Sequence, residues 1–214
     1  MSFLGYRAGH VIQEGDYVLA YASPRHVKCV QVTTGTTLNG RWGHIKASDL
    51  LQAKYRFGDK VVTSKGSFFA LHPTPEAWTN VLPTRTQILF LPDIAMITAE
   101  LFLRPGSVVI EAGTGSGSFT HALARTVRHP DPQRTGTVLT FEFHQKRYET
   151  ATIEFEEHGL LPSVVQTHHR DVCKDGFAYT RRADAIFLDV PEPWLALHHA
   201  TAAFKVAFIF LSFL

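Results

Sequence analysis

The feature that most constrains this sequence is a glycine-rich turn inside residues 108–126 (VVIEAGTGSGSFTHALART). The apolar residues 108–110 predict a buried strand that ends at Glu111, and the stretch after the turn predicts a helix. Residues without a Cβ allow a sharp turn in which backbone N–H groups come close to a ligand, and three alternate here: Gly113, Gly115 and Gly117. The sequence therefore predicts a nucleotide-type ligand at the carboxyl end of a strand in an open α/β sheet.

The spacing of the glycines restricts the ligand. The turn has no Gly-Lys-Ser/Thr ending, which disfavours a phosphate-binding P-loop, and G-x-G-x-G is tighter than the dinucleotide pattern. Glu111, just before the turn, suits an ammonium group and would repel a pyrophosphate. The pattern indicates S-adenosylmethionine (SAM), which joins an adenosine to a zwitterionic methionine. Two alternatives stay open: the glycines only make a compact turn, or the chain is an oxidoreductase that binds NAD.

Composition excludes several other classes of protein. A length of 214 residues allows one large domain, or a small and a medium one, and the net charge of +2 comes from scattered Lys and Arg. Two cysteines make neither a disulfide framework nor a metal motif, so we expect a reducing compartment. The pairs His168-His169 and His198-His199 lack zinc spacing and are expected in loops or at the surface, so no metal is expected. The apolar run 206–214 is too short to cross a membrane.

The chain is expected to divide into three parts. Residues 1–72 carry short strand-like runs separated by turn formers such as Asn39-Gly40, which favours a small barrel or sandwich. Residues 73–106 form a proline-bearing connector and a helix at 93–103, which Asp93 would cap. Residues 107–214 form an α/β domain.

In the α/β domain, strands and helices alternate. Strands are expected at 108–111, 137–142, 163–167 and 184–188, and helices at 117–127, 144–158 and 192–204, with a turn at 170–176. This order predicts a parallel sheet with helices on both faces, the Rossmann-like fold class.

Three acidic residues stand at the ends of three of these strands. Glu142 is placed to accept hydrogen bonds from ribose hydroxyls, although a surface glutamate is the ordinary alternative. Asp171 is placed to reach an adenine amine, or it only makes a turn. Asp189 opens Asp-Val-Pro-Glu-Pro-Trp, where two prolines and Trp194 would hold it to align a flat polar substrate; the alternative is a helix cap beside a core tryptophan.

Taken together, the motifs resemble a known family, the catalytic subunits of the eukaryotic tRNA (adenine-58-N1) methyltransferase, which are class I SAM-dependent enzymes. The resemblance extends from Met1 to about Val206 and rests on these segments: MSF at the start, Gly15-Asp16, His72-Pro-Thr-Pro-Glu-x-Trp78, Arg85-Thr-Gln-Ile88, Arg104-Pro-Gly-Ser107, Gly113-Thr-Gly-Ser-Gly117, Glu142-Phe-His-Gln145, Asp171-Val-Cys173 and Phe187-Leu-Asp-x-Pro191.

The resemblance implies a complete set of functional residues. SAM would contact Leu89, Ser116, Gly117, Ser118, Glu142, Arg147, Asp171, Val172 and Asp189, in addition to the glycine loop. Asp189 would be the catalytic residue, Gln87, Ala112 and the N-terminal β-rich domain would contact tRNA, and Trp194 would stack on the target base. The family works in the nucleus as a heterotetramer with a homologous non-catalytic, tRNA-binding subunit, and no membrane is involved.

The sequence departs from the family at its end. Lys205-Val206 runs directly into AFIFLSFL without a glycine turn, so at most five of the seven strands of a class I sheet are expected. We therefore expect a C-terminally truncated form with weak or absent methylation, and a non-catalytic protein that binds the partner or tRNA is the alternative. A methylase acting on N6 of adenine is a further alternative, although its Asn/Asp-Pro-Pro-aromatic signature spaces the prolines differently.

Overall fold

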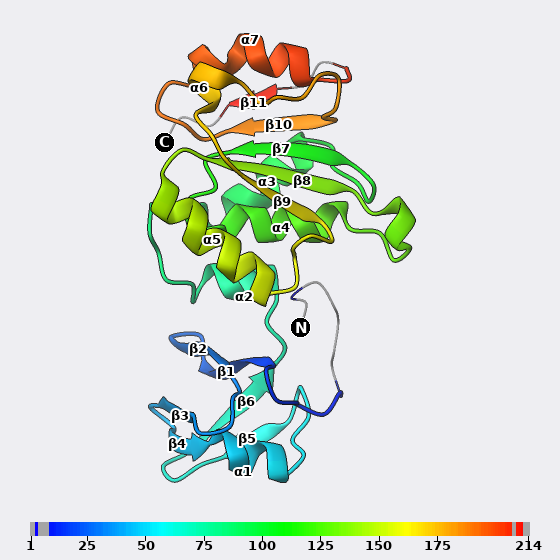
Figure 1. Cartoon of the computed structure of the whole chain (residues 1–214). Coiled ribbons are helices and arrows are strands. Elements are labelled where there is room, and N and C mark those ends of the chain that lie inside the picture. Colours follow the sequence, from blue (N-terminus) through cyan, green and yellow to red (C-terminus); the bar gives the residue numbers. More distant parts are fainter. Residues whose placement is uncertain (1–2, 4–8, 207–208, 212–214) are drawn as a thin grey trace. The chain divides into compact units, whose positions relative to one another are not determined.

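The structure, a computed structural model, describes residue 3, residues 9–206 and residues 209–211. It divides into two compact units, Met1–Leu82 and Pro83–Leu214 (Figure 1). No helix of the described residues is long and apolar enough to span a bilayer.

The first unit is built on antiparallel strands. Four of them form a sheet in the order β2-β1-β6-β5, and two form a separate hairpin. The bounds are β1 Tyr17–Ser23, β2 His26–Gln31, β3 Thr37–Gly40, β4 Gly43–Lys46, β5 Lys60–Val62 and β6 Ser67–Leu71, with helices α1 Ala47–Gln52 and α2 Pro75–Thr79. The core of this unit includes Trp42 against Phe68, with ring centroids 5.0 Å apart. The short strands predicted for this region are confirmed, but the pairing of the described strands does not confirm a barrel.

The hairpin corrects one turn assignment. Asn39 and Gly40 were expected to make a turn, but both lie in β3, where Asn39 pairs with His44 and Gly40 with Gly43. The turn therefore falls at residues 41–42. Gly43, the first residue of β4 after this turn, has φ +103°, a conformation that a side chain disfavours.

The second unit is a parallel sheet in the order β11-β10-β7-β8-β9. The strands are β7 Val108–Ala112, β8 Thr137–Glu142, β9 Val165–His169, β10 Ala185–Leu188 and β11 Ile209–Leu211. The helices are α3 Leu91–Glu100, α4 Ser118–Val127, α5 Gln145–Glu157, α6 Val172–Asp175 and α7 Pro193–Ala203, with a 3-10 turn η1 at Pro132–Arg134. The predicted alternation of strands and helices is confirmed.

Two local predictions for this unit were wrong. Helix α3 begins at Leu91 after the cap residue Phe90, so Asp93 lies inside its first turn and is not the cap. Pro92 explains the earlier start, since proline is favoured at the first positions of a helix. The turn expected at 170–176 contains the short helix α6, which Asp171 caps by accepting from the N–H groups of Cys173 and Lys174.

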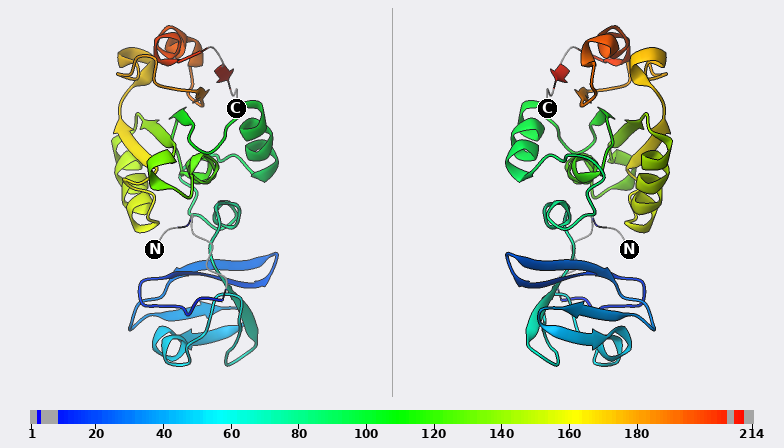
Figure 2. Two further views of the ribbon diagram at one scale, coloured as in Figure 1. Left: turned by 90° about the vertical axis from the view of Figure 1, so that its right-hand side faces the viewer. Right: turned by 90° about the vertical axis from the view of Figure 1, so that its left-hand side faces the viewer.

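Alternate residues of β7 face two different helical layers. Val108, Ile110 and Ala112 join an apolar cluster with alanines of α7. Between them, Glu111 accepts a hydrogen bond from Thr120 of α4 at 2.6 Å. The side views of Figure 2 show helices around this sheet. The sheet therefore has an apolar face toward α7 and a face toward α4 that contains polar groups.

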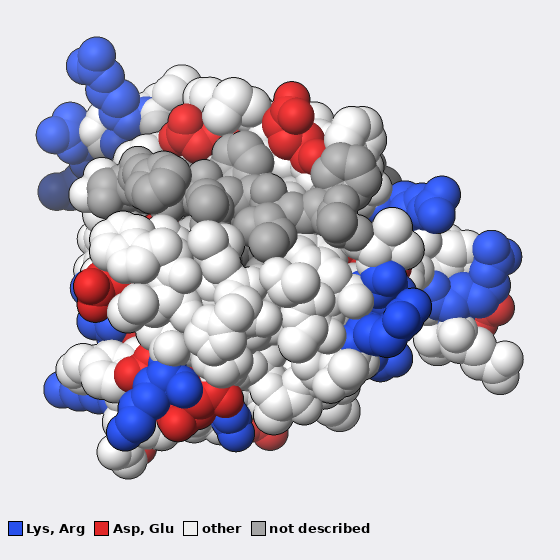
Figure 3. All heavy atoms as spheres, turned by 90° about the horizontal axis from the view of Figure 1, so that it is seen from above, with Lys and Arg blue, Asp and Glu red and all other residues white. Residues whose placement is uncertain are grey.

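Figure 3 shows the charged residues on one face of the structure. On the face shown in Figure 3, Lys and Arg stand in separate groups near the margin, around an area of uncharged residues. Among the described histidines, His169 and His198 are exposed and His168 and His199 are half-buried. No cluster of three or more potential metal ligands occurs among the described residues.

Candidate ligand cavity at the carboxyl edge of the sheet

A cavity of about 690 Å³ lies at the carboxyl ends of the parallel strands of the second unit. Its walls come from the segments that follow β7, β8, β9 and β10 and from a short stretch before α3. The lining residues are Thr86, Gln87, Gly113, Gly115, Phe141, Glu142, Phe143, Arg147, Arg170, Asp171, Val172, Cys173, Asp189, Val190, Pro191, Glu192 and Pro193. This edge is where open α/β sheets bind ligands.

The glycine loop forms one wall of the cavity through Gly113 and Gly115. At Gly113 the neighbouring backbone leaves no room for a side chain. Gly113 has φ +98°, and a Cβ on it would overlap the backbone carbonyl oxygen of Asp189. The N–H of Asp189 in turn donates to the carbonyl of Ala112 at 2.8 Å. The ends of β7 and β10 are therefore held backbone to backbone, and this contact fixes where the Asp189 side chain begins.

Glu142 links the glycine loop to the wall formed after β8. Its Oε2 accepts from the N–H of Gly115 at 3.0 Å, and its Oε1 accepts from the N–H of His144 at 2.9 Å and from the Arg147 guanidinium at 2.8 Å. The carboxylate is only 3% exposed. Charge-assisted hydrogen bonds of this kind are strong and directional, so Glu142 is fixed in place before any ligand arrives.

Carboxyl groups outnumber cations in the cavity. Glu142, Asp171, Asp189 and Glu192 line it, against two arginines, of which Arg147 is paired with Glu142. Burial raises the pKa of Asp189 above its ordinary value. The cavity therefore suits a ligand that carries positive charge and disfavours a pyrophosphate.

Glu111 lies beside the cavity but does not line it. It is 1% exposed, and its Oε2 accepts from Thr120 Oγ1 at 2.6 Å and from Thr140 Oγ1 at 2.7 Å. Burial, followed by the charges of Asp189 and Glu142, raises the pKa of Glu111 to about 7, against the opposing effect of the two threonine hydrogen bonds. Burial therefore favours the protonated, uncharged form of the Glu111 side chain in the folded chain.

Asp171 has the turn role that the sequence offered as an alternative, while it also lines the cavity. Its Oδ1 accepts from the N–H of Cys173 at 3.0 Å and of Lys174 at 3.3 Å. A cap of this kind orients the carboxylate and places the first residue of α6, Val172, at the cavity wall.

Only some of the functional residues predicted from the sequence line the cavity. Eight of those residues line it: Gln87, Gly113, Gly115, Glu142, Arg147, Asp171, Val172 and Asp189. Seven others lie outside its lining: Leu89, Glu111, Ala112, Ser116, Gly117, Ser118 and Trp194. Ser118 and Leu89 are adjacent, since Ser118 Oγ donates to the Leu89 carbonyl at 3.3 Å, whereas Trp194 is 55% exposed on α7. The proposed roles of these residues stay predictions.

Sequence reasoning missed how the stretch before α3 reaches the cavity. The hydroxyl of Ser116 accepts from the N–H of Arg85 at 2.8 Å and from the N–H of Thr86 at 3.2 Å. The Arg85 guanidinium makes a bidentate pair with Glu154 of α5, at 2.7 and 3.0 Å. A serine inside the glycine loop is therefore the anchor of this stretch, a role that its position between two glycines does not reveal.

Comparisons with known proteins agree with this geometry. The chain is 46% identical over 204 residues to the TRM61 catalytic subunit of tRNA (adenine(58)-N(1))-methyltransferase from Candida albicans, covering 93% of this chain and 58% of the relative. It is 42% identical to the subunit of the same name from Schizosaccharomyces pombe, covering 88% of this chain and 51% of the relative. The chain thus spans about half the length of these curated relatives.

Two solved structures share its fold. A SAM-dependent O-methyltransferase from Thermotoga maritima matches with a TM-score of 0.76 and 27% identity, covering 91% of this chain and 70% of that one. The tRNA (m1A58) methyltransferase TrmI from Aquifex aeolicus matches with a TM-score of 0.72 and 26% identity, covering 91% and 72%. The second unit therefore has the class I SAM-methyltransferase fold. Residues 66–213 match the family described as the tRNA methyltransferase complex GCD14 subunit, and the chain belongs to that family.

Proposed function

We propose that this chain binds SAM in the cavity at the carboxyl edge of the sheet and transfers a methyl group to N1 of adenine 58 in tRNA. The observation that carries the proposal is that Gly113, Glu142 and Asp189 line one cavity in a chain that belongs to this family. The names of the relatives, which specify adenine 58 and N1, support the substrate.

The residues of the cavity fit SAM. SAM carries a sulfonium and an ammonium group, and the excess of carboxyl groups stabilises such a cation. Glu142, fixed by Gly115 and Arg147, would accept from the ribose hydroxyls, and Asp171 with Val172 would hold the adenine. The close backbone approach at Gly113, where a Cβ would overlap the Asp189 carbonyl, holds this wall of the cavity in position. When bound, SAM supplies an electrophilic methyl group.

Asp189 would act on the acceptor base. Attack by N1 places positive charge on the adenine, and a carboxylate that accepts a hydrogen bond from the N6 amine orients the ring and stabilises that charge. The raised pKa of Asp189 makes it a stronger hydrogen-bond acceptor and also a better base at neutral pH. Pro191 and Pro193, which line the same wall, restrict the backbone that carries it. Because N1 is buried in base pairing, the adenine must leave its stack first.

The remaining contacts extend beyond the cavity. We propose that the β-rich residues 1–72, together with Gln87 and Ala112, contact tRNA and that Trp194 stacks on the displaced base. A homologous non-catalytic subunit would supply further tRNA contacts, which the family's description as part of a complex supports. The modest net charge of +2 fits binding shared between subunits.

Calorimetry with SAM tests the first half of the proposal. We expect wild-type chain to bind SAM and Glu142→Gln to bind it at least about tenfold more weakly, because a charged hydrogen bond of about 1.5–3 kcal/mol is lost. Asp93→Asn, which removes an exposed carboxylate of α3 outside the cavity, is the matched control and should bind as wild type. Failure of the wild-type chain to bind SAM would overturn the proposal.

Methyl transfer tests the second half. The chain is mixed with a non-catalytic subunit of the same family, unmodified tRNA and labelled SAM, and the product nucleosides are separated. We expect 1-methyladenosine, and Asp189→Asn should lower the rate far more than the affinity for SAM. Label on N6, or an unchanged rate in Asp189→Asn, would contradict the assigned chemistry.

A further inference from the structure

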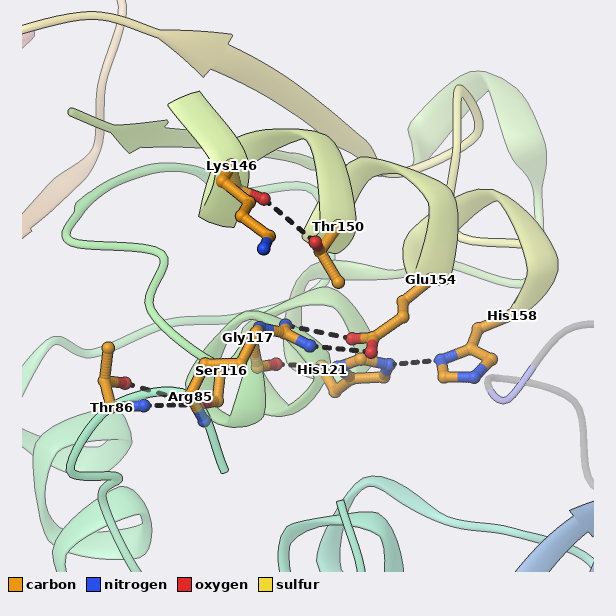
Figure 4. A network of polar contacts seen from close by, with 9 residues as sticks. All are labelled: Arg85, Thr86, Ser116, Gly117, His121, Lys146, Thr150, Glu154 and His158. Atoms are coloured by element: carbon orange, nitrogen blue, oxygen red, sulfur yellow. Dashed lines mark hydrogen bonds and ion pairs between the residues drawn. The ribbon is translucent and has the colours of Figure 1, made fainter. Parts of the chain in front are cut away.

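Two buried histidines lie next to the glycine loop and do not line the cavity. His121 of α4 is 0% exposed, and His158, which follows α5, is 1% exposed. Their rings are joined by a contact of 2.9 Å between His121 Nε2 and His158 Nδ1 (Figure 4). Neither residue belongs to the proposed SAM or tRNA contacts, yet both are buried polar groups that must be satisfied.

The contact to the loop determines which ring nitrogens carry protons. His121 Nδ1 lies 2.6 Å from the carbonyl oxygen of Gly117, and a carbonyl oxygen only accepts, so Nδ1–H donates. In a neutral ring Nε2 then carries a lone pair and accepts from His158 Nδ1–H. Burial lowers the pKa of His121 to about 4 and that of His158 to about 2, so both rings are neutral at physiological pH.

Gly117 is the point where the loop becomes helix α4. It has φ +75° and is the N-cap residue of α4. Its carbonyl accepts both from the backbone N–H of His121 at 3.2 Å and from the ring Nδ1–H. A Cβ at Gly117 would lie 2.8 Å from the Phe155 ring. The glycine is therefore enclosed by a histidine donor and an aromatic ring, whose centroids are 5.4 Å apart.

The last turns of α5 supply most of this support. Glu154 pairs with Arg85, whose backbone is bound by Ser116; Phe155 closes the space at Gly117; and His158 holds His121. Arg85, which also lowers the pKa of His121, is neutralised by Glu154. Figure 4 shows the chains of contacts from Glu154 through Arg85 to Ser116 and from His158 through His121 to Gly117. One end of α5 is thus linked to the loop through Arg85 and His121.

We propose that His121 is a positioning residue of the SAM site, whose Nδ1–H fixes the Gly117 carbonyl, and that His158 holds His121 in the tautomer this requires. The proposal rests on the proposed function, because the geometry it maintains is that of the loop which would receive SAM. A fixed loop binds more tightly, since no ordering of the loop is needed when the ligand arrives.

Two substitutions of similar size test the donor. Asparagine places its amide N–H where His121 has Nδ1–H, whereas leucine has no donor. We expect His121→Leu to weaken SAM binding about tenfold, a change of about 1.4 kcal/mol, and His121→Asn to bind within about threefold of wild type. Ile186→Val, a mild change in the apolar face toward α7, is the control for general destabilisation and should bind as wild type. Equal affinity of the leucine and asparagine variants would overturn the positioning role.

Nitrogen NMR of the histidine rings tests the tautomers without SAM. In the wild-type chain between pH 5 and 8, we expect both His121 and His158 to be neutral with the proton on Nδ1. A proton on Nε2 of His121, or a charged His121 ring at pH 7, would overturn the proposal even if the leucine variant did not fold. If the tautomers are as expected but the wild-type chain does not bind SAM, then the proposed function fails and the hydrogen-bonded pair remains.

Discussion

The two faces of the parallel sheet differ in the polarity of the residues that they bury. Toward α7, residues such as Ile110 and Ile186 pack against small side chains in an apolar cluster. Toward α4 and α5, Glu111, His121 and His158 are buried with their hydrogen bonds made inside the protein. Burying polar groups reduces stability unless they are satisfied, so their concentration on one face indicates where function constrains the sequence. The glycine loop lies at the end of that face.

The largest expected effect on SAM binding is at the glycine that closes the loop against β10. In Gly113→Ala, the methyl group would overlap the Asp189 carbonyl, and φ +98° is strained for alanine. We expect SAM affinity to fall at least about 100-fold, equivalent to about 2.7 kcal/mol, measured by calorimetry. Gly35→Ala is the matched control for strain alone, since φ there is +94° with open space around it. Unchanged affinity in Gly113→Ala would show that the contact is not needed.

The next effect separates the faces by stability. Ile186→Ala opens a cavity in the apolar cluster, and we expect a loss of about 2–5 kcal/mol in the free energy of unfolding. The affinity of the folded variant for SAM should change little, because Ile186 does not line the ligand cavity. Urea unfolding and calorimetry measure the two quantities. Ile153→Ala, at a residue that is 58% exposed, should cost much less, and an equal loss there would contradict the comparison.

The polar face should respond to pH through Glu111. Its pKa rises from 4.5 in the unfolded chain to about 7 in the folded one. Below 4.5 both states hold the proton; as the pH rises toward 7 only the unfolded state loses it, so the folded state is progressively disfavoured. Above pH 7 the penalty reaches about 3 kcal/mol, since one pKa unit corresponds to about 1.4 kcal/mol.

Glu111→Gln removes this dependence while keeping an acceptor for Thr120. From pH 5 to pH 8, the free energy of unfolding of the variant should therefore improve relative to wild type by up to about 3 kcal/mol. The control is Glu100→Gln, at an exposed residue of α3. Its free energy of unfolding should change with pH in the same way as that of the wild-type chain. Parallel profiles for wild type and Glu111→Gln would mean that Glu111 is charged in the folded chain at pH 7.

The smallest effect compares an ion pair made by α5 with one at the amino ends of β7 and β10. Arg85 and Glu154 each have 17% of the side chain exposed and make a bidentate pair, whereas Lys205 and Asp184 are 41% and 38% exposed. Double-mutant cycles should give a coupling energy of about 1 kcal/mol or more for the first pair and about 0.5 kcal/mol or less for the second. A larger coupling for Lys205–Asp184 would reverse the expected order.

The sequence predicted the parts of the molecule that depend on local pattern. The alternation of strands and helices, the glycine loop and the placement of Glu142, Asp171 and Asp189 after strands follow from periodicity and turn residues, and β8 has its predicted bounds. These features need only neighbouring residues, so a single sequence contains them. The start of α3 and the hairpin turn were each displaced by two residues because caps and register depend on packing.

What the sequence could not show are contacts between distant segments. His121 lies 37 residues from His158, and nothing in either local pattern indicates that the rings meet. The same holds for Ser116 with Arg85 and for the burial that makes Glu111 a weak acid. Each of these depends on how α4, α5 and the stretch before α3 pack on the sheet, which composition and spacing do not specify.

The meeting of Gly113 with the Asp189 carbonyl has a consequence for protein engineering. The segment after β10, which would bind the acceptor base, and the glycine loop, which would bind the methyl donor, line the same wall. Their main chains are in direct contact at Asp189 and Gly113. A designer who reshapes residues 190–193 to accept a different nucleobase must therefore leave the peptide plane after Asp189 where it is. Under the proposed function, moving that peptide would disturb the donor site together with the acceptor site, so we expect new specificity here to come from side chains alone.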